Sequence, residues 1–436
     1  MFDRTMNFFR ETIKDFPDNR HYSPNLTYRM EDFALSAFSI FFLQNPSFLA
    51  HQKAMEKAKG KNNARALFGI SKIPCDNQIR GVLDEVEPQK LDPMFDKILE
   101  EFSQTPSFKT FRGVEGNILA ALDGTWYFSS QEVHCVNCST MEHKKGQITY
   151  YHSAITPVIV APGQKYAISL KPEFIVPQDG HEKQDCETTA AKRWINKHAQ
   201  QYAQMGTITF LGDDIYSKQP MCQEILDKQQ HFIFVCKEDS HKTLYEWIKL
   251  LEKEKDLAIF TEKKWNGKFW EIYTYKYTNG APLRDTDDAL MVNWLDITIT
   301  KKSGEALYHN AFITDHQITQ ENVASVAVSG RCRWKIENEN NNTLKTKGYH
   351  LEHNFGHGQK YLSSLFATMN ILAFLSHTLL DWVDEKYRLL RKSLPARKTF
   401  FEHLRALTCY VCFESWDQML DFMLEGLEIE HNFNTC

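Results

Sequence analysis

The spacing of apolar residues predicts that residues 1–110 are helical. Side chains such as Phe33, Ala37 and Ile40 recur at three- and four-residue intervals, which is the spacing of the buried face of a helix. Alternating runs that would indicate strands are scarce in this part of the chain. We therefore expect a helical domain over 1–110.

The pattern changes at residue 118 to short apolar runs and alternating runs, which are typical of strands. The predicted elements follow one another as strand 118–122, strand 148–161, strand 165–176, helix 185–202, strand 207–211, helix 219–229 and strand 231–236. Pro162-Gly163-Gln164, between the second and third strands, is a hairpin signal. This order predicts the α/β class, with a mixed sheet and flanking helices.

Two aspartates end apolar strands in this layout. Asp123 follows the run 118–122, and Asp213 follows the run 207–211. A right-handed crossover through the helix at 185–202 returns the fourth strand beside the first, so we expect both carboxylates in one pocket that binds divalent cations. The alternative is that each Asp is an ordinary cap or turn residue.

The second half of the chain contains a β-rich interruption followed by helices. Residues 240–325 contain strand-like alternating runs, with turns at Asn279-Gly280 and Ser303-Gly304. A long apolar helix over 360–391 is expected to close the core. Its most apolar part, 362–383, contains several polar residues, which favours a buried helix over a membrane span.

Composition is that of a folded globular protein. The 436 residues are 42% hydrophobic and 25% charged. The 51 basic and 56 acidic residues give a net charge of -5, so a polyanionic partner would have to bind local basic patches. The N-terminal sequence lacks the continuous apolar region of a secretory signal, so we expect a cytoplasmic protein.

Two segments are candidate basic patches for a polyanion. Residues 53–65 hold five basic residues and one acid, and residues 386–405 hold seven basic residues and one acid. The candidate DNA-binding residues in these segments are Lys59, Lys61, Arg391 and Lys392. Two interpretations of 1–110 stay open, a helical bundle with a solvated basic edge and a DNA-binding domain with a helix-turn-helix near 64–86.

Cysteine and histidine cluster in the region of the predicted hairpin. The candidate zinc ligands there are Cys135, Cys138, His143 and His152. A C-x2-C pair with two nearby histidines could close a tetrahedral Zn²⁺ site, and the alternative is a loop with ordinary reduced thiols. A zinc-dependent hydrolase is the weaker hypothesis, because four protein ligands leave no open position for water.

Three short motifs together resemble the catalytic blocks of a known family. They are Leu122-Asp123-Gly124-Thr125, Gly212-Asp213-Asp214-Ile215-Tyr216, and Arg333-Trp334-Lys335-Ile336-Glu337 followed by Lys345. With these motifs, the chain resembles bacterial insertion-sequence transposases of the DDE class, in the branch with a Tyr-x2-Arg-x3-Glu-x6-Lys signature. The chain departs from that signature in two places, with Gly330 at the Tyr position and Lys345 one residue farther from Glu337.

The resemblance implies a site and a reaction. Asp123, Asp213 and Glu337 would be the metal-binding triad, preferred over the neighbouring Asp214 and Glu339, and would hold two Mg²⁺ ions. The implied reaction frees a 3′ end of the transposon, forms a hairpin and joins the end to target DNA. The implied partners are double-stranded DNA and a second copy of the chain in a homodimer on paired ends, without a membrane.

The resemblance also implies several DNA contacts. Arg333 and Lys345 belong to the signature and are candidate DNA-binding residues. In that branch an aromatic of the β-rich insertion stacks on a flipped base, which makes Trp265, Trp270 and Trp294 candidates, with Trp294 preferred. Each of these tryptophans could equally be part of an ordinary β core.

The predicted fold is therefore an RNase H-like mixed sheet with flanking helices, a β-rich insertion and helical regions at both ends. The expected divisions are a helical DNA-binding domain 1–110, a first part of the catalytic core 111–239, an insertion 240–325, returning core helices 326–385 and a C-terminal helical region 386–436. The rival function is a DNA-binding protein of transposase origin that no longer cuts. The block from Gly348 to Gly358, with three histidines, could bind metal, contact phosphate or start a helix.

Overall fold

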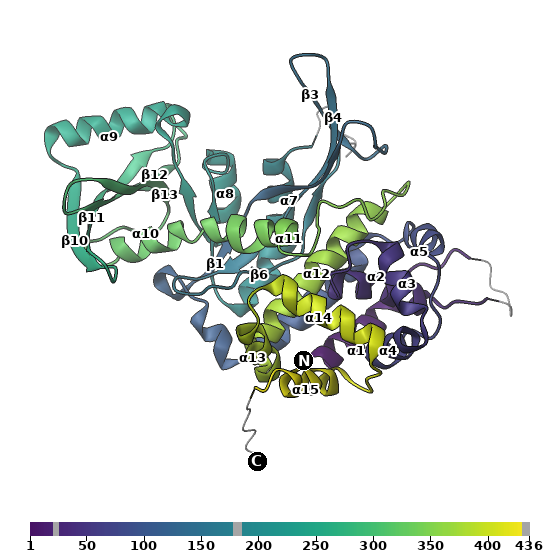
Figure 1. Ribbon diagram of the computed structural model, residues 1–436. Helices are drawn as coiled ribbons and strands as arrows, with labels where there is room; N and C mark the ends of the chain where they lie inside the picture. The colour runs from purple at the N-terminus through teal and green to yellow at the C-terminus, as the bar shows by residue number, and fades with distance from the viewer. Residues whose placement is uncertain (21–25, 178–184, 430–436) are drawn as a thin grey trace.

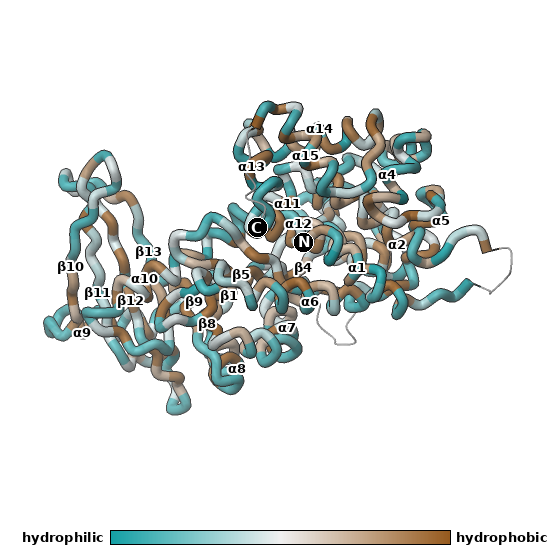
Figure 2. Tube along the Cα trace, turned by 90° about the horizontal axis from the view of Figure 1, so that it is seen from below, coloured by the Kyte–Doolittle hydropathy of each residue, from teal (hydrophilic) through white to brown (hydrophobic). Residues whose placement is uncertain are grey.

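The protein is a mixed α/β structure with one large mixed sheet, a smaller second sheet and many helices (Figure 1). The computed structural model describes residues 1–20, 26–177 and 185–429, so the end of the predicted C-terminal region, 430–436, lies outside the described residues. Figures 1 and 2 both show helices from the two ends of the sequence gathered on one side and a β-rich extension on the other.

The N-terminal part is helical, as the apolar spacing predicts. Its elements are α1 (Phe2–Ile13), α2 (Met30–Phe42), α3 (Phe48–Met55), α4 (Ala58–Phe68), α5 (Asp76–Leu83), α6 (Asp92–Ser103) and the short 3-10 turns η1 (Pro88–Leu91), η2 (Pro106–Thr110) and η3 (Val114–Gly116). Helix α4 ends at Gly69, whose φ of 73° is the left-handed conformation that glycine adopts most readily.

The C-terminal helices pack against these N-terminal helices. They are α12 (Leu362–Val383), α13 (Glu385–Ser393), α14 (Arg397–Tyr410) and α15 (Trp416–Gly426). The Asn63 side chain donates hydrogen bonds to the carbonyls of Thr408 (2.8 Å) and Val411 (2.7 Å). The rings of Phe2 and Trp416 stack with centroids 4.6 Å apart. The two end regions, expected as separate parts of the chain, therefore share one apolar core.

Helix α12 lies at the centre of this helical body. By length and composition it is apolar enough to cross a membrane, but 89% of its most apolar window is buried inside the protein. Several of its polar residues are hydrogen-bonded within the core: His377, for example, bonds the carbonyl of Phe42 at 2.8 Å and the hydroxyl of Tyr387 at 3.0 Å. A buried core helix is what the interrupting polar residues predict.

The large sheet has nine strands in the order β10-β11-β12-β13-β9-β8-β1-β5-β6. Its central strands are β1 (Ile118–Ala121), β5 (Val158–Val160), β6 (Ile168–Ser169), β8 (Ile208–Gly212) and β9 (His231–Val235), and the helices between them are α7 (Glu187–Tyr202) and α8 (Gln219–Asp227), with the 3-10 turn η4 (Ala203–Met205) after α7. β8 is parallel to β1 and to β9, whereas β5 is antiparallel to β1.

The central strands are apolar on both faces because both faces are covered. Ile118 and Ala120 belong to a core that also contains residues of α7 and α12. Leu119 and Ala121 point to the other face and belong to a core with residues of α10 (Val323–Arg331). A strand buried on both sides appears in the sequence as a continuous apolar run.

A smaller four-stranded sheet continues the first three strands beyond the large sheet. It contains β2 (Gly124–Ser130), β3 (Ser139–Glu142), β4 (Ile148–Ile155) and β7 (Glu173–Ile175). The predicted strands 148–161 and 165–176 are thus each two strands, interrupted at Pro157 and Pro172, because proline has no N–H to donate to a ladder. The first strand changes sheets at Asp123.

The region 240–325 extends the large sheet. The 3-10 turn η5 (Glu238–Ser240) leads into it, and its elements are α9 (Lys242–Glu254), β10 (Ala258–Trp265), β11 (Trp270–Pro282), β12 (Met291–Lys301) and β13 (Ala306–Thr314). β13 pairs with β9 in antiparallel register, Ile313 opposite Phe234, so the β-rich insertion joins the edge of the core sheet. After α10, a π-helical turn η6 (Ile336–Asn341) and α11 (Asn342–Thr346) lead back toward α12.

Candidate active site

The structure brings Asp123 and Asp213 to the same edge of the large sheet. β1 and β8 are parallel neighbours, with Ala121 opposite Leu211, and the Leu122 N–H donates to the Leu211 carbonyl at 2.8 Å. Asp123 lies two residues after the end of β1, and Asp213 directly follows β8. The carboxyl ends of adjacent parallel strands therefore place both acids side by side.

Asp123 lies in a strongly acidic environment. Burial, together with the negative charges of Glu187, Glu337 and Asp213, raises the pKa of its carboxyl to about 7, although the positive charge of Arg333 opposes that shift. The four acids are thus close enough for their charges to act on one another. Such a group of carboxylates is stabilised by a bound cation or by protonation.

The helical segment that follows α10 places Glu337 beside this group of acids. Glu337 lies in the π-helical turn η6, and the Arg333 guanidinium forms an ion pair with its carboxylate at 2.6 Å. π-Helical turns are rare and occur often at functional sites. Glu339, two residues on, instead lines a different groove, together with Lys165 and Trp334. Arg333, a candidate DNA contact from the sequence, is therefore engaged with a carboxylate of the site.

Asn341 holds Asp123, and sequence reasoning missed this residue. Its Nδ2 donates to Oδ2 of Asp123 at 3.0 Å, and its Oδ1 accepts from the Thr156 hydroxyl at 2.7 Å. Asn341 is buried, so these bonds fix the orientation of its amide. The run of asparagines at 340–342 after the third motif was the available signal.

Glu187, at the start of α7, was also missed. Its Oε1 accepts from the Gly124 N–H at 3.1 Å and from the Tyr216 hydroxyl at 2.7 Å. A Cβ on Gly124 would lie 2.5 Å from the Glu187 carboxylate, so a larger residue after Asp123 would displace the Glu187 side chain. Burial raises the pKa of Glu187, and the charge of Asp213 adds to that effect. Gly124 of the first motif and Tyr216 of the second motif thus both donate hydrogen bonds to Glu187.

Asp214 differs from Asp213 in its surroundings. Asp214 is buried, and its carboxylate accepts from the Lys237 N–H at 2.6 Å and from the Ser240 hydroxyl, with the His241 ring 3.7 Å away. Asp213 is partly exposed and accepts the Ile215 N–H at 3.0 Å. Asp214 therefore fastens the loop after β9, and Asp213 faces the acidic group.

The proposed basic contacts differ in how available they are. Lys59 and Lys61 are exposed on α4, and Lys61 lines a groove of about 830 Å³. Lys345 forms an ion pair with Glu352 at 2.9 Å. Lys392 is exposed at the end of α13.

Arg391 is a correction to the expected basic surface. Its guanidinium lies over the Phe400 ring, 5.5 Å from the centroid, with Nε and Nη1 buried. Other basic residues of 386–405 are also used internally: Lys386 pairs with Asp417 at 2.8 Å, and Arg405 donates to the Gln44 carbonyl at 2.8 Å. The charge count of this segment overestimates its exposed charge, because amphipathic helices bury one side of it.

Trp294 is a second correction. It is 3% exposed and packs edge-on against Tyr245 with centroids 6.0 Å apart, so its ring has no free face for a base. Trp265 and Trp270 are 55% and 52% exposed, and they face one another across the β10–β11 hairpin with centroids 5.6 Å apart. The alternation along β12 turns Trp294 inward.

The metal-ligand cluster differs from the predicted set in one member. Potential ligand atoms of Cys135, Cys138, His152 and His357 all lie within 4.8 Å of one another. His143 lies outside this cluster, just beyond β3, and its Nε2 bonds the Thr149 hydroxyl at 2.8 Å. The short spacing in sequence suggested His143, whereas the fold brings His357 from a distant loop.

Comparisons with known proteins show similarity to solved structures and no match to a family model or a curated protein. No model of a protein family matches this sequence, and no curated protein matches it. Among solved structures, the chain is similar to the cryo-EM structure of the piggyBac transposase synaptic complex with hairpin DNA. The match has a TM-score of 0.42 and 9% sequence identity, and it covers 97% of this chain and 80% of that chain.

Proposed function

We propose that this protein is a metal-dependent DNA transposase of the DDE type, with Asp123, Asp213 and Glu337 as its catalytic acids. The observation that carries the proposal is the convergence of these three carboxylates on one sheet edge, where the charges of Asp213 and Glu337 both act on Asp123. The acids come from three separate segments of the chain. Only Asp214 and Glu339 compete with them by sequence position. Asp214 accepts hydrogen bonds from the loop after β9, and Glu339 lines a different groove.

The topology of the central strands supports an RNase H-like core. The order is β6-β5-β1-β8-β9, with an antiparallel hairpin on one side of β1 and two parallel strands, reached through α7 and α8, on the other. A core of this kind binds its metals at the carboxyl ends of the first and fourth strands, which correspond here to β1 and β8. We propose that the insertion β10–β13 extends this core at β9.

The donor set of the site fits Mg²⁺. Carboxylate oxygens are the ligands this ion prefers, and one or two protein carboxylates suffice for each ion when phosphate oxygens and water complete the shell. When bound, Mg²⁺ lowers the pKa of an attacking hydroxyl and offsets charge on the leaving oxygen. The raised pKa of Asp123 supports the fit, since a bound cation would stabilise the charged carboxylate that burial and the neighbouring acids disfavour.

The remaining residues of the site orient the acids. Asn341 holds one oxygen of Asp123 and leaves the other for a ligand. Arg333 holds Glu337 on the exposed surface of η6, from which either side chain reaches a phosphate. The Tyr216 hydroxyl and the Gly124 N–H donate hydrogen bonds to Glu187 and fix its orientation. We therefore propose Glu187 as a positioning residue and not a fourth metal ligand.

The proposed reaction has four steps. Water attacks the phosphorus at the transposon end and breaks the P–O3′ bond, which leaves a 3′-hydroxyl and a 5′-phosphate. The 3′-hydroxyl then attacks the phosphate of the opposite strand, forms a hairpin and releases the flanking DNA. Water then attacks the hairpin phosphate and regenerates the 3′-hydroxyl. In the last step this hydroxyl attacks a phosphate of the target strand and displaces a 3′-hydroxyl of the target. We propose that a homodimer holds the paired ends.

The test is Mg²⁺-dependent cleavage of DNA that carries the sequences flanking the gene. Asp123→Asn, Asp213→Asn and Glu337→Gln should each lower cleavage by at least about 10³-fold and leave DNA binding, measured by fluorescence anisotropy, unchanged. Glu339→Gln is the matched control and should cleave normally. Near-normal cleavage by a triad variant would exclude that residue from the site.

The same experiment separates the proposal from its rival. Wild-type protein that binds the DNA but never cuts it, at any Mg²⁺ or Mn²⁺ concentration, would identify a DNA-binding protein without catalytic activity. Wild-type protein that neither binds nor cuts would contradict both hypotheses.

A further inference from the structure

We propose that Cys135, Cys138, His152 and His357 bind one structural Zn²⁺ ion. The Sγ atoms of Cys135 and Cys138 are 3.8 Å apart, and the Nε2 atom of His152 is 3.4 Å from the first sulfur and 3.5 Å from the second. Nε2 of His357 is 3.8 Å from the Cys138 sulfur. Four ligand atoms of the types that zinc prefers thus converge on one point.

These separations match the edges of a zinc tetrahedron. With Zn–S bonds of about 2.3 Å and Zn–N bonds of about 2.0–2.1 Å, two sulfurs lie about 3.8 Å apart and a sulfur and a nitrogen about 3.6 Å apart. Hydrogen bonding alone does not account for the arrangement, because it leaves two imidazoles and two thiols facing the same small volume. Two thiolates and two imidazoles close the coordination shell, so the proposed role is structural.

The sequence near each ligand explains how the site forms. The segment between β2 and β3 turns tightly at the C-x2-C pair, where the Cys138 N–H donates to the Cys135 carbonyl at 3.2 Å. His152 follows on β4, opposite Phe128 of β2. His357 comes from the loop before α12, more than 200 positions away. The site therefore joins the smaller sheet to the helical body.

Two glycines and an aspartate shape the loop that holds His357. Gly356 and Gly358 have φ values of 148° and 66°, which other residues rarely adopt, so the loop turns sharply on both sides of His357. Asp84 of the N-terminal region accepts the N–H groups of Gln359 (2.7 Å) and Leu362 (3.0 Å) at the start of α12. These contacts account for part of the block 348–358 that the sequence left unassigned.

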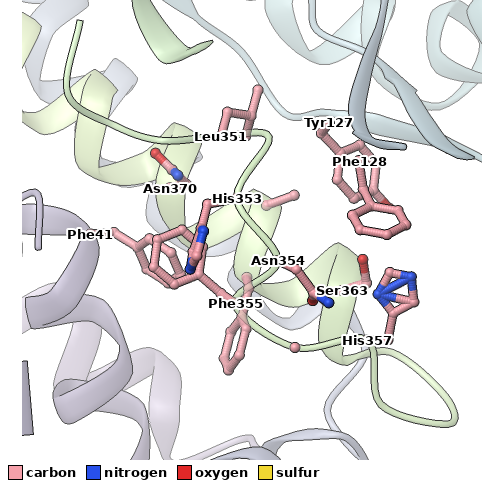
Figure 3. Close-up of a pocket in the computed structure, with 13 residues that line it drawn as sticks. Phe41, Tyr127, Phe128, Leu351, His353, Asn354, Phe355, His357, Ser363 and Asn370 are labelled. Atoms are coloured by element: carbon pink, nitrogen blue, oxygen red, sulfur yellow. The ribbon is translucent and has the colours of Figure 1, made fainter. Parts of the chain in front are cut away.

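Aromatic rings pack against both histidine ligands. The Tyr127 ring stacks on His152, with centroids 5.5 Å apart and planes 13° apart. The Phe128 ring packs edge-on against His357 with ring centroids 4.1 Å apart. Figure 3 shows His357 lying beside Phe128 and Ser363. A hydrogen bond makes a second connection between the same two segments, since the Asn137 side chain donates to the Lys360 carbonyl at 2.8 Å.

The proposal does not rest on the transposase proposal. It uses thiolates and imidazoles, whereas the acidic site uses carboxylates, and these donor sets favour different metals. Loss of zinc is expected to loosen the contact between the smaller sheet and the loop before α12. A metal site of this kind stabilises the fold because binding is coupled to folding.

The test is metal content and metal spectroscopy on the full-length protein. Purified wild type should contain about one zinc per chain by elemental mass spectrometry. His357→Ala should lose most of that zinc and lower the melting temperature, whereas His143→Ala, the matched control, should keep both. A wild type without zinc, or a His357→Ala variant that keeps zinc as His143→Ala does, would overturn the proposal.

A second measurement covers the case in which His357→Ala fails to fold. The wild type is stripped with a chelator and titrated with Co²⁺, which reports its ligands by absorption. One equivalent should give the d–d bands of a tetrahedral site and the thiolate charge-transfer band, and Zn²⁺ should remove both. Absence of these bands in protein whose thiols are shown to be reduced would contradict the proposed ligand set.

Discussion

Asn341 donates a hydrogen bond from Nδ2 to Oδ2 of Asp123 at 3.0 Å, although the two residues are 218 positions apart in the chain. The same Asn341 accepts hydrogen bonds from the Thr156 hydroxyl and the Asn340 amide. One buried amide thus connects the end of β1, the junction of β4 and β5, and the returning helical segment. It orients the acid at the centre of the proposed active site.

The first prediction concerns this bond. Asn341→Ala should lower the cleavage rate by about 10- to 100-fold, the usual effect of removing a group that orients a metal ligand. Because Asp123 would be less well placed, the Mg²⁺ concentration for half-maximal cleavage should rise, and DNA affinity should not change. Asn338→Ala, which removes an exposed amide bonded to the Trp334 carbonyl, is the control. Equal Mg²⁺ dependence in the two variants would show that Asn341 has no positioning role.

The second prediction separates Asp214 from Asp213. Asp214→Ala should destabilise the protein by about 1.5–3 kcal/mol, the usual contribution of a hydrogen bond to a charged group, because the Lys237 N–H and the Ser240 hydroxyl lose their charged acceptor. Asp213→Asn should leave the unfolding midpoint in urea nearly unchanged and abolish cleavage. At temperatures well below melting, Asp214→Ala should retain cleavage. Loss of activity with full stability in Asp214→Ala would reverse the assignment of the two acids.

The third prediction is a pH dependence of stability from a buried histidine. Burial lowers the pKa of His377 to about 3, and the neutral ring is held by the Phe42 carbonyl and the Tyr387 hydroxyl. Between about pH 6.5 and about pH 3 the unfolded chain binds a proton at this residue and the folded chain does not. Its contribution to stability is therefore lost as pH falls, by about 1.4 kcal/mol per unit.

Replacing His377 should change that dependence. His377→Gln should be less stable than wild type at about pH 7, and the difference in unfolding free energy should shrink as pH falls toward about 4. Urea unfolding at these two pH values measures both quantities. A constant difference at the two pH values would mean that His377 does not contribute to acid sensitivity.

The fourth prediction concerns the basic surface of α4. Lys59→Glu combined with Lys61→Glu should weaken DNA binding and make its salt dependence less steep, by about 0.9 in the log–log slope for each phosphate that the variant no longer neutralises. Arg391→Ala should instead lower the melting temperature and leave the slope unchanged, because the guanidinium packs on Phe400. Lys392→Glu tests the exposed end of α13. An unchanged slope in the α4 variant would exclude this helix from the DNA interface.

The fifth prediction distinguishes the tryptophans of the insertion. Trp294→Ala should cost about 3–5 kcal/mol of stability, because it leaves a cavity in a packed core. Trp265→Ala and Trp270→Ala should be nearly neutral for stability, since both rings are exposed. If one of these rings stacks on a flipped base, its variant should nick DNA normally and form fewer hairpins on a gel. Equal nicking and hairpin formation in both variants would exclude the pair from that role.

The local pattern of the sequence was enough to predict the elements and part of their arrangement. The continuous apolar runs at β1 and β8 predict strands buried on both faces, and the helix between them predicts that they are parallel neighbours. That reasoning placed Asp123 and Asp213 at one edge of the sheet, and the structure has them there. This reasoning works because the spacing of apolar residues, the length of each element and the handedness of a crossover connection all depend on local sterics.

Tertiary structure decided which side chains face each other. Nothing near His357 in the sequence indicates that it meets Cys135, and nothing near Asn341 indicates that it holds Asp123. The same dependence on tertiary packing explains why two candidate DNA contacts were wrong. Arg391 and Trp294 have side chains suited to DNA binding, but packing turns both inward. Long-range contacts and burial depend on how whole elements pack, and that packing is set by the complete apolar surface of the chain rather than by any short motif.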